Sequence, residues 1–286
     1  MKDLISKKEY ISGAIVLYNN NPAVVSRAIR SFVEHRRSEI LYLIDNSPTD
    51  ELKSLAAISN KIIYIPSNDN PGFGSAHNKG IKKSLEEGYP YHIILNPDVT
   101  FMPAILDELF LFMELNPDIG NVMPNVFYAN GELQKLCNLI PTPLNLIVRR
   151  FALFPRLSKL INEKYDIEGF LYDRIAEVPN LSGCFMFLRN KILEKTGGFD
   201  ERFFMYMEDV DLSRRLNEVS KTVFYPHVSI THNFEKGSYA NYKLLKYHIF
   251  SAIKYFNKWG WFFDANRRKI NKETLSRIRN YQSTYK

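Results

Sequence analysis

The first hundred residues alternate regularly between short apolar, β-favouring runs and longer segments with helical spacing. A strand, a helix and a second strand form the unit of a parallel sheet with right-handed crossovers. Asn21 and Pro22 mark the start of the first helix, because asparagine is a good N-cap and proline fits the first helical turn. The pattern predicts an α/β domain with a mainly parallel central sheet, with strands over 11–17, 40–44, 62–65 and 91–95 and helices over 22–35, 50–58 and 75–87.

The second half of the chain is less regular. The expected elements are a helix over 104–115, an antiparallel hairpin at Asn130-Gly131, a sheet strand within 182–190, an acid-rich helix from about 208, and two short strands over 222–226 and 228–232. Residues 140–180 contain four prolines and the basic cluster Arg149, Arg150 and Arg156. We interpret this stretch as a partly helical flap over a site.

Polar side chains follow three of the first four strands, where each strand ends. They are Tyr18-Asn19, Asp45-Asn46-Ser47 and Asn96-Pro97-Asp98. Proline cannot donate to a sheet ladder and an ionised carboxylate is costly to bury, so Asn96-Pro97-Asp98 should face solvent or a ligand. Because ligands of parallel sheets bind at the carboxyl ends of the strands, these residues predict a binding site at that edge. The alternative is a set of polar turns without a ligand.

The third strand leads into SNDNPGFGSAHNKG, which resembles a dinucleotide-binding glycine loop. Gly72 and Gly74 have the required spacing, but His77 replaces the third glycine and the loop follows a later strand instead of the first. The sequence therefore argues against a nicotinamide cofactor.

A second acidic cluster, Glu208-Asp209-Val210-Asp211, stands at the start of a predicted helix. Acids in a first helical turn complement the helix dipole, and that role alone is one interpretation. Three acids in four residues exceed what capping needs, however, and the apolar stretch 203–207 before them favours a raised carboxylate pKa. The cluster is thus a candidate source of a general base.

The composition, with 45% hydrophobic and 24% charged residues, is that of an ordinary globular protein. No stretch is long and apolar enough for a membrane span, and MKDLISKKEY lacks the apolar segment of a signal peptide. We therefore expect a cytoplasmic protein. Cys137 and Cys184 have no metal-like spacing and are interpreted as reduced core thiols.

The basic charge is concentrated at the end of the chain. Residues 236–286 contain twelve Lys and Arg against two acids, a net +10, which leaves −3 for the rest of a chain of net charge +7. This tail has an apolar stripe at helical spacing, with Trp261 near its end: Leu245, Ile249, Ala252, Phe256, Trp259 and Phe263. Either the tail packs on the domain, or it lies on the anionic inner leaflet of a membrane. We expect no nucleic-acid partner, since no reading motif accompanies the charge.

Taken in order, the motifs resemble those of family 2 glycosyltransferases of the GT-A fold, especially the bacterial O-antigen and capsule rhamnosyltransferase-like branch. The resemblance covers about 10–235 and is based on AIVLYN, IDNSPTD, the NPGFGSAHNKG loop, LNPDV, SGCFMFLRN and GGFDERFFMYMEDVDLSRR. It implies a GT-A domain over 1–235, with a nucleotide-sugar half over about 10–100 and an acceptor half over about 101–235, and a basic amphipathic helical tail over 236–286.

The resemblance also implies a metal site and a base. In the family an Asp-x-Asp signature holds a divalent metal on the donor diphosphate; here it reads Asn96-Pro97-Asp98, so the metal role passes to Asp98. His232 matches a position where some members supply another ligand, the alternative being a structural histidine. Asp209 matches the general base. The implied reaction is a single inverting displacement assisted by Mg²⁺ or Mn²⁺.

Donor residues carry over in the same way. Tyr18 would stack on a pyrimidine, Asp45 would accept a hydrogen bond from its N3–H, and Asn96 would lie near the ribose. Asn19, Asn46 and Asn78 complete the implied donor-binding set.

The implied function is transfer of a sugar from a dTDP- or UDP-sugar, with dTDP-rhamnose favoured by the branch, to a glycan or lipid-linked glycan in cell-surface polysaccharide synthesis. Two alternatives remain at this stage. A sugar nucleotidyltransferase would need a basic phosphate-gripping loop soon after the first strand, whereas YNNNPAVVS has no basic residue before Arg27. A catalytically silent nucleotide-sugar binding module would account for the incomplete Asp-x-Asp.

Overall fold

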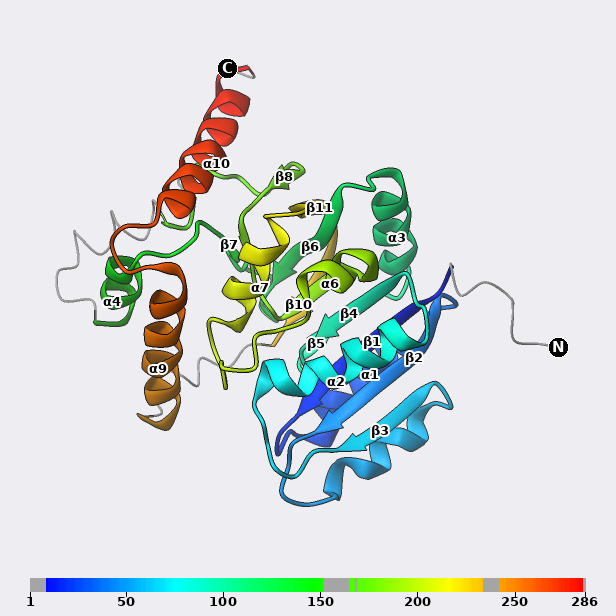
Figure 1. Ribbon diagram of the computed structural model, residues 1–286. Coiled ribbons are helices and arrows are strands. Elements are labelled where there is room, and N and C mark those ends of the chain that lie inside the picture. The colour runs from blue at the N-terminus through cyan, green and yellow to red at the C-terminus, as the bar shows by residue number, and fades with distance from the viewer. Residues whose placement is uncertain (1–8, 152–164, 168, 234–241, 285–286) are drawn as a thin grey trace.

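The structure is a computed structural model that describes residues 9–151, 165–167, 169–233 and 242–284. Its centre is a nine-stranded mixed sheet with the order β3-β2-β1-β4-β10-β6-β11-β5, in which β8 also pairs with β11 (Figure 1). A second, two-stranded sheet joins β7 (Cys137–Asn138) to β9 (Asn180–Leu181). The central sheet combines a parallel half from the start of the chain with a mixed half from its middle.

The parallel half confirms the predicted alternation of strands and helices. Its strands are β1 (Ile11–Leu17), β2 (Ser38–Asp45), β3 (Ile62–Pro66) and β4 (Tyr91–Leu95), with β1 paired in parallel to both β2 and β4. Every residue of β1 and β4 is buried, as expected for strands covered on both faces. Between the strands lie α1 (Pro22–Val33), the 3₁₀ helix η2 (Glu51–Ile58) and α2 (Phe73–Glu86).

The first helix begins where the sequence predicts. The Asn21 side-chain oxygen accepts a hydrogen bond from the Ala23 N–H at 2.9 Å, and Pro22 is the first helical residue. This cap satisfies one of the free N–H groups of the first turn. The chain therefore leaves the carboxyl end of β1 through a fixed turn that contains Tyr18 and Asn19.

The mixed half begins after β4. Its strands are β5 (Val99–Thr100), β6 (Ile119–Phe127), β8 (Ala176–Glu177), β10 (Phe185–Arg189) and β11 (Lys221–His232), and its helices are α3 (Ile105–Leu115), α6 (Asn190–Thr196) and α7 (Glu208–Leu216). Strand β10 is antiparallel to both β4 and β6, and therefore joins the two halves of the sheet. Strand β11 runs parallel to β6 and antiparallel to β5.

One prediction for the mixed half was wrong in detail. The two short strands expected over 222–226 and 228–232 form the single strand β11, because a register shift between Tyr225 and Ser229 accommodates Pro226, which has no N–H to donate. The antiparallel hairpin predicted at Asn130-Gly131 is present but short: Phe127 and Leu133 form an antiparallel bridge, and the Tyr128 N–H donates to Glu132 O at 2.8 Å. The next strand, β7, pairs with β9.

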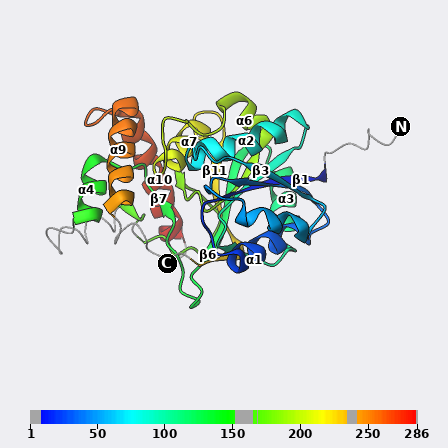
Figure 2. The same cartoon turned by 90° about the horizontal axis from the view of Figure 1, so that it is seen from below.

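Helices cover both faces of the sheet (Figure 2). The face that bears α1 and α3 holds the largest apolar cluster, which includes Phe32 and Leu109. The opposite face bears α2, α6 and α7, whose side chains pack on β4 and β10 through a second cluster that includes Ile94 and Leu212. Helix α7, which begins with the acidic cluster, is thus fixed directly over the sheet.

The remaining helices lie together at one side of the sheet: α4 (Pro143–Phe151), α9 (Tyr242–Trp259) and α10 (Ala265–Thr284) (Figure 1). Tyr255 and Phe256 of α9 are buried in a cluster with Phe203, Met207 and Val210 around the start of α7. Of the two interpretations of the tail, packing on the domain is therefore confirmed for this face of α9.

The predicted apolar stripe is wrong at two of its members: Ile249 is exposed on α9, and the stripe does not extend to Phe263. Helix α9 ends at Trp259, and Gly260 turns the chain with a φ of +97°. Phe263 is 92% exposed in the connection to α10. Among the described helices, none combines the length and the apolar character needed to cross a bilayer.

The flap expected over 140–180 includes α4, so it is partly helical. Arg156 lies outside the described residues, in the stretch 152–164. Cys137 and Cys184 are buried free thiols, as expected.

Candidate active site

The carboxyl ends of β1 and β2 are tied together by backbone and side-chain hydrogen bonds. The Asn19 N–H donates to Ser47 Oγ at 2.8 Å, and Asn19 itself has a left-handed φ of 52°. Tyr18, just before it, is half exposed at 50%. The predicted aromatic ring thus stands at the mouth of the sheet, where it is accessible to a ligand.

Asp45 and Asn46 lie buried beneath this mouth. Asp45 accepts one hydrogen bond from the Ser47 N–H at 2.9 Å and another from the Tyr64 hydroxyl at 2.8 Å, which fix the carboxylate in position. Asn46 Oδ1 has no hydrogen-bond partner among the described residues. A buried acceptor without a partner at the ligand edge of a sheet indicates a place for a ligand donor.

Asp98 and His232 are brought together although the sequence separates them widely. Strand β5 pairs with the end of β11, where His232 lies opposite Val99, and His232 Nε2 is 3.4 Å from Asp98 Oδ1. The other ring nitrogen, Nδ1, lies 3.1 Å from Gln134 Oε1. Burial opposes the charge of His232, but the hydrogen bond to Asp98 contributes to raising its pKa to about 10.

This pair fits a divalent cation. One carboxylate oxygen and one imidazole nitrogen stand adjacent, with Asp98 partly exposed. A carboxylate suits Mg²⁺ and Mn²⁺, and a neutral imidazole is a common ligand of metal ions. Within the described residues no group of three or more His, Cys, Asp or Glu side chains could hold a metal ion. Magnesium-type sites on nucleotides commonly use one or two protein ligands and complete the shell with water and phosphate oxygens, so two ligands suffice.

Asp209 lies in a pocket of about 290 Å³. Its Oδ2 accepts a hydrogen bond from the Gly183 N–H at 3.1 Å and its Oδ1 accepts one from the Val210 N–H at 2.8 Å. Burial raises the pKa of Asp209, and these two N–H groups limit the rise. A carboxylate fixed by backbone donors and facing a pocket has the geometry of a proton acceptor.

The other two acids of α7 have different environments. Glu208 is buried, its Oε2 lacks a partner among the described residues, and burial followed by the charge of Asp209 raises its pKa well above the ordinary value. Asp211 is fully buried and lies 2.8 Å from Arg215 and 2.6 Å from Lys258. Asp211 is therefore a structural ion-pair residue, whereas Glu208 and Asp209 line the pocket.

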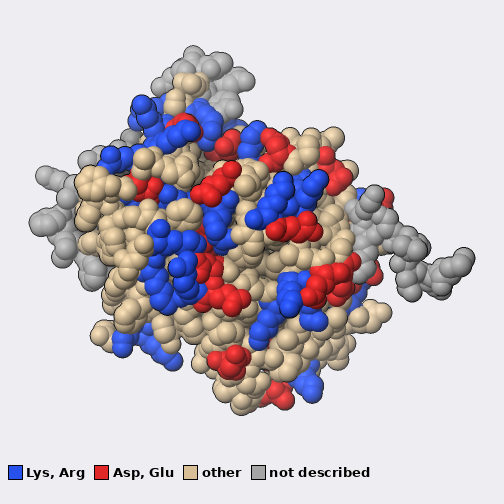
Figure 3. All heavy atoms as spheres, viewed as in Figure 1, with Lys and Arg blue, Asp and Glu red and all other residues tan. Residues whose placement is uncertain are grey.

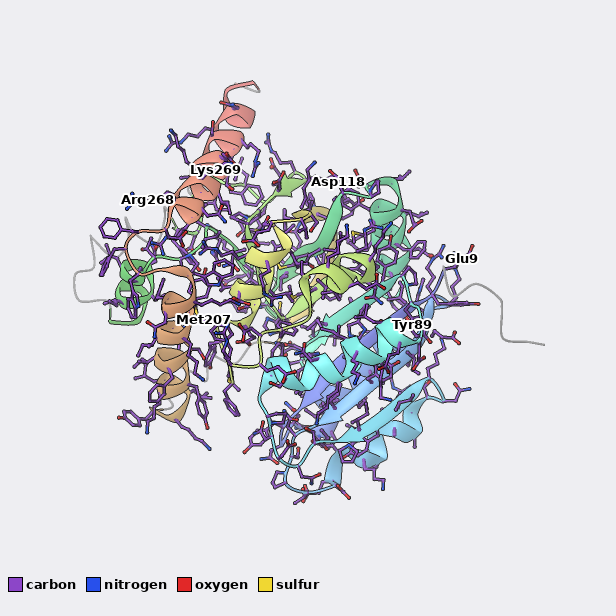
Figure 4. The ribbon with its side chains drawn as sticks, viewed as in Figure 1. Glu9, Tyr89, Asp118, Met207, Arg268 and Lys269 are labelled. Carbon is purple, nitrogen blue, oxygen red and sulfur yellow. The ribbon has the colours of Figure 1, made fainter. Side chains whose placement is uncertain are left out.

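A strained turn delivers these acids to the pocket. Tyr206 and Met207 both have φ of 68°, which is unfavourable for side-chain-bearing residues. A hydrogen bond from the start of α2 holds this turn, since the Phe73 N–H donates to Phe204 O at 2.9 Å. Figure 4 shows Met207 where α7 meets α9, far from Glu9 and Tyr89, which lie just before β1 and β4.

The segment 182–184 connects the two predicted half-sites. The Asn96 N–H donates to Cys184 O at 2.9 Å, and the neighbouring Gly183 N–H donates to Asp209. A side chain at Gly183 would come within 3.1 Å of the Asp209 Cβ, so the glycine permits the close approach. Asn96, next to the candidate metal ligand, and Asp209 are therefore linked through consecutive residues of one segment.

Asn78 is placed differently from the other predicted donor residues. Its Nδ2 donates to Phe199 O and to Glu201 Oε1, both at 2.9 Å, and its Oδ1 accepts from the Phe199 N–H at 2.8 Å. These bonds connect α2 to the loop that precedes the 203–207 turn, which is a supporting position.

Sequence reasoning missed several residues of the Asp209 pocket. Tyr165 and Asn180 line it from the middle of the chain, and Leu245 and His248 line it from α9. The only available signal was the apolar stripe of the tail, which includes Leu245 but does not indicate where α9 docks. The tail predicted as a separate helical segment thus forms one wall of the pocket.

A mixed sheet with a ligand mouth at the ends of β1, β2 and β4, and an acid-bearing helix over β10, defines the GT-A class of glycosyltransferases. Two solved structures share the fold over nearly the whole chain. TarS 1-349 of S. aureus in complex with UDP has a TM-score of 0.58 at 13% identity, over 96% of this chain and 73% of that one. The mannosyltransferase PcManGT from Pyrobaculum calidifontis, in complex with GDP-Man and Mn²⁺, has a TM-score of 0.57 at 13% identity, over 98% and 76%.

The family is shown by the sequence itself. The family model "Glycosyl transferase family 2" matches residues 12–197, and the chain belongs to this family. The N-acetylglucosaminyl-diphospho-decaprenol L-rhamnosyltransferase of Mycobacterium tuberculosis is 29% identical over 206 residues, which are 67% of this chain and 65% of that protein. The low-salt glycan biosynthesis hexosyltransferase Agl10 of Haloferax volcanii is 26% identical over 174 residues, which are 60% of this chain and 52% of that protein.

Proposed function

We propose that this protein transfers a sugar, with inversion, from a nucleotide diphosphate donor to a glycan or lipid-linked glycan acceptor. The observation that best supports this function is the link through residues 182–184 between Asn96, beside Asp98, and the pocket carboxylate Asp209. The leaving group of the donor, near Asn96, and the acceptor hydroxyl, near Asp209, would then both lie next to residues 182–184.

The donor half would occupy the ends of β1, β2 and β4. Tyr18 is exposed enough to stack on a pyrimidine, Asp45 is oriented to accept its N3–H, and the free Oδ1 of Asn46 offers a further acceptor. Asn96 is assigned to the ribose. We assign Asn19 and Asn78 to the support of this half, since their hydrogen bonds fix the β1 turn and the 199–201 loop. The preferred donor is dTDP-rhamnose, with UDP-sugars as the alternative, and the rhamnosyltransferase relative supports this preference.

Asp98 and His232 would hold Mg²⁺ or Mn²⁺. A bound cation would take up the negative charge that develops on the leaving diphosphate. His232 would have to be neutral to serve as a ligand, and Nε2, 3.4 Å from Asp98 Oδ1, is the atom that would do so.

Asp209 would accept the proton of the acceptor hydroxyl as that oxygen attacks the anomeric carbon. Burial raises its pKa, which makes its carboxylate a stronger base than that of an exposed aspartate. The N–H groups of Gly183 and Val210 keep its oxygens oriented during this step. Residues 101–235 would thus supply the acceptor side and residues 10–100 the donor side.

We also propose that the protein works in cell-surface polysaccharide synthesis on the cytoplasmic side of the membrane, as a peripheral protein. The supporting surface is the outer face of α9, which exposes Tyr242, Ile249, Phe250 and Ile253. No acidic residue occurs between Tyr242 and Phe263. An apolar helix face without negative charge fits an anionic bilayer surface.

Donor binding can be tested by thermal shift with a panel of nucleotide sugars, with and without Mn²⁺. A donor present at a hundred times its dissociation constant adds about 2.7 kcal/mol, which for a chain of this size raises Tm by several degrees. We expect the largest shift with dTDP-rhamnose and Mn²⁺, and loss of the Mn²⁺ effect in Asp98→Ala but not in Asp50→Ala, an exposed acid beside η2. If no nucleotide sugar stabilises the protein, the proposed function is wrong.

A further inference from the structure

A second pocket, of about 750 Å³, lies between α10 and residues 139–145. We call it the α10 groove. Its charged lining residues are Arg267, Arg268, Lys272 and Arg279, and none of its lining residues is acidic. The rest of the lining is largely apolar or amide-bearing, with Leu139, Leu144 and Leu275 as its aliphatic side chains beside Ile140. One of these cations, Arg267, pairs with Asp264 at 3.9 Å, and the α10 groove therefore combines the positive charge of the other three with apolar walls.

Three of the four cations are available to a ligand. Arg268, Lys272 and Arg279 are exposed and recur on one face of α10, four and then seven residues apart. Within the part of the chain that the structure describes, Lys272 and Arg279 form no ion pair, and the Arg268 side chain donates only to Phe262 O, at 3.1 Å. Arg267, in contrast, is buried and donates to Trp261 O at 3.1 Å. Figure 3 shows the basic side chains on the part of the surface where α10 lies, and Figure 4 shows Arg268 near the start of this helix.

The α10 groove adjoins the Asp209 pocket. Tyr165 lines both, and α4 contributes Leu144 to the groove and Leu146 to the pocket. Helix α10 is fixed to the boundary between them, because the Asn271 amide exchanges two 2.9 Å hydrogen bonds with the Ile140 backbone. A molecule with its reacting hydroxyl at Asp209 would extend across Tyr165 into the groove.

We propose that the α10 groove binds the phosphate or diphosphate that links an acceptor glycan to its lipid. Three cations that form no ion pair among the described residues fit a group of two or three negative charges, and the aliphatic walls fit the first units of the lipid chain. A neutral glycan would gain no binding energy from the positive charge of these three side chains. The assignment to an acceptor rests on the proposed function, whereas the binding of a lipid diphosphate can be measured independently of it.

The test is calorimetric titration of the full chain with farnesyl diphosphate, a soluble lipid diphosphate, in saturating UDP and Mg²⁺ to fill the donor site. The variant Lys272→Gln/Arg279→Gln removes two groove cations. The control Lys269→Gln/Lys191→Gln removes the same charge from exposed residues that do not line the groove. We expect the groove variant to bind at least about tenfold more weakly, a difference of about 1.4 kcal/mol, and the control to bind like the wild type, because only the groove variant lacks two charge-assisted contacts.

Four results would overturn the inference. The groove variant could bind farnesyl diphosphate as tightly as the wild type does, or the control variant could lose as much affinity as the groove variant. UDP could compete with farnesyl diphosphate, or farnesol could bind as tightly as farnesyl diphosphate. Two further ligands separate the sources of phosphate. Equal affinity for inorganic pyrophosphate would mean a free-anion site, and equal affinity for dihexanoyl phosphatidic acid would mean a lipid-headgroup site, and either result contradicts the proposal. If farnesyl diphosphate binds as expected but no nucleotide sugar does, the groove stands and the proposed function fails.

Discussion

At the scale of single residues, the three acids of α7 show how environment divides the roles of chemically similar groups. Asp211 is neutralised by Lys258 and Arg215 and also accepts a hydrogen bond from Trp259 Nε1 at 2.8 Å. Glu208 has neither a cation nor a donor for Oε2 among the described residues. Asp209 alone combines a pocket, two backbone donors and a raised pKa. The sequence predicts an acidic cluster, but the separation of roles within it depends on contacts with α9 and β10.

The buried carboxyl of Glu208 should make stability depend on pH. Burial raises its folded pKa well above the unfolded value, so the folded state holds the proton more tightly and loses stability as pH rises through the folded pKa. In Glu208→Gln this loss is absent. We expect the Tm values of wild type and variant to be close at pH 5, and the variant to become progressively more stable than the wild type toward pH 9. Parallel melting curves across this range would show that Glu208 has a cation partner.

At the scale of elements, the parallel half of the sheet was predictable because its signals are local. Asn21-Pro22 fixes the start of α1, and the apolar runs at 11–17 and 91–95 define strands buried on both faces. The contact between Asp98 and His232 could be inferred only through the family resemblance, because it depends on β5 pairing with the far end of β11. Pro226 was interpreted as a strand end because the register shift that accommodates it is a property of the sheet.

The turn before α7 depends on a glycine in another element. Gly72 has a φ of +99°, and a Cβ there would lie 2.2 Å from Phe204 O, in the backbone that leads to the acidic cluster. We expect Gly72→Ala to lower the free energy of unfolding by about 2 kcal/mol or more and to reduce transfer activity. Denaturant titration measures the first effect. Gly88→Ala is the matched control, since Gly88 has a φ of +75° but nothing within 4 Å of its Cβ. Equal losses in the two variants would mean that the Phe204 contact is unimportant.

The outer face of α9 predicts membrane binding. In Ile249→Ser/Phe250→Ser, two exposed apolar side chains are removed without touching the buried face of the helix. We expect this variant to sediment less with phosphatidylglycerol vesicles at low salt than the wild type does. The matched control is Leu111→Ser/Leu115→Ser, which removes two exposed apolar side chains from α3. A wild type that never sediments, or a control that loses as much binding, would contradict the membrane assignment.

At the scale of the whole molecule, the C-terminal helices support the site as well as covering it. Arg214 of α7 and Asp264, just before α10, are both buried and form two hydrogen bonds of 2.7 Å, and the Arg214 guanidinium lies 4.1 Å from the Trp259 ring centroid. Deleting the chain after Asn241 would remove these partners of Arg214 and also uncover the apolar cluster around the start of α7, so it would destabilise the domain itself. The C-terminal helices are therefore better tested by point substitutions on their exposed faces than by deletion. No sequence pattern indicated the long-range pair of Arg214 and Asp264.

The central claim is that the two halves of the molecule form one catalytic site with Asp209 as its base, and Asp209→Asn tests it most directly. Asparagine keeps the size of the side chain but cannot accept the proton. The measurement is the rate at which wild type and variant release nucleoside diphosphate, in the presence of a lipid-linked acceptor and Mn²⁺. The donor is the nucleotide sugar that gives the largest thermal shift. We expect turnover by the wild type, and a loss of at least about a hundredfold in the variant, while the donor-induced rise in Tm is unchanged. A variant that retains more than about a tenth of the wild-type rate would place the base elsewhere. A wild type that binds donor without releasing nucleoside diphosphate would identify the protein as a binding module.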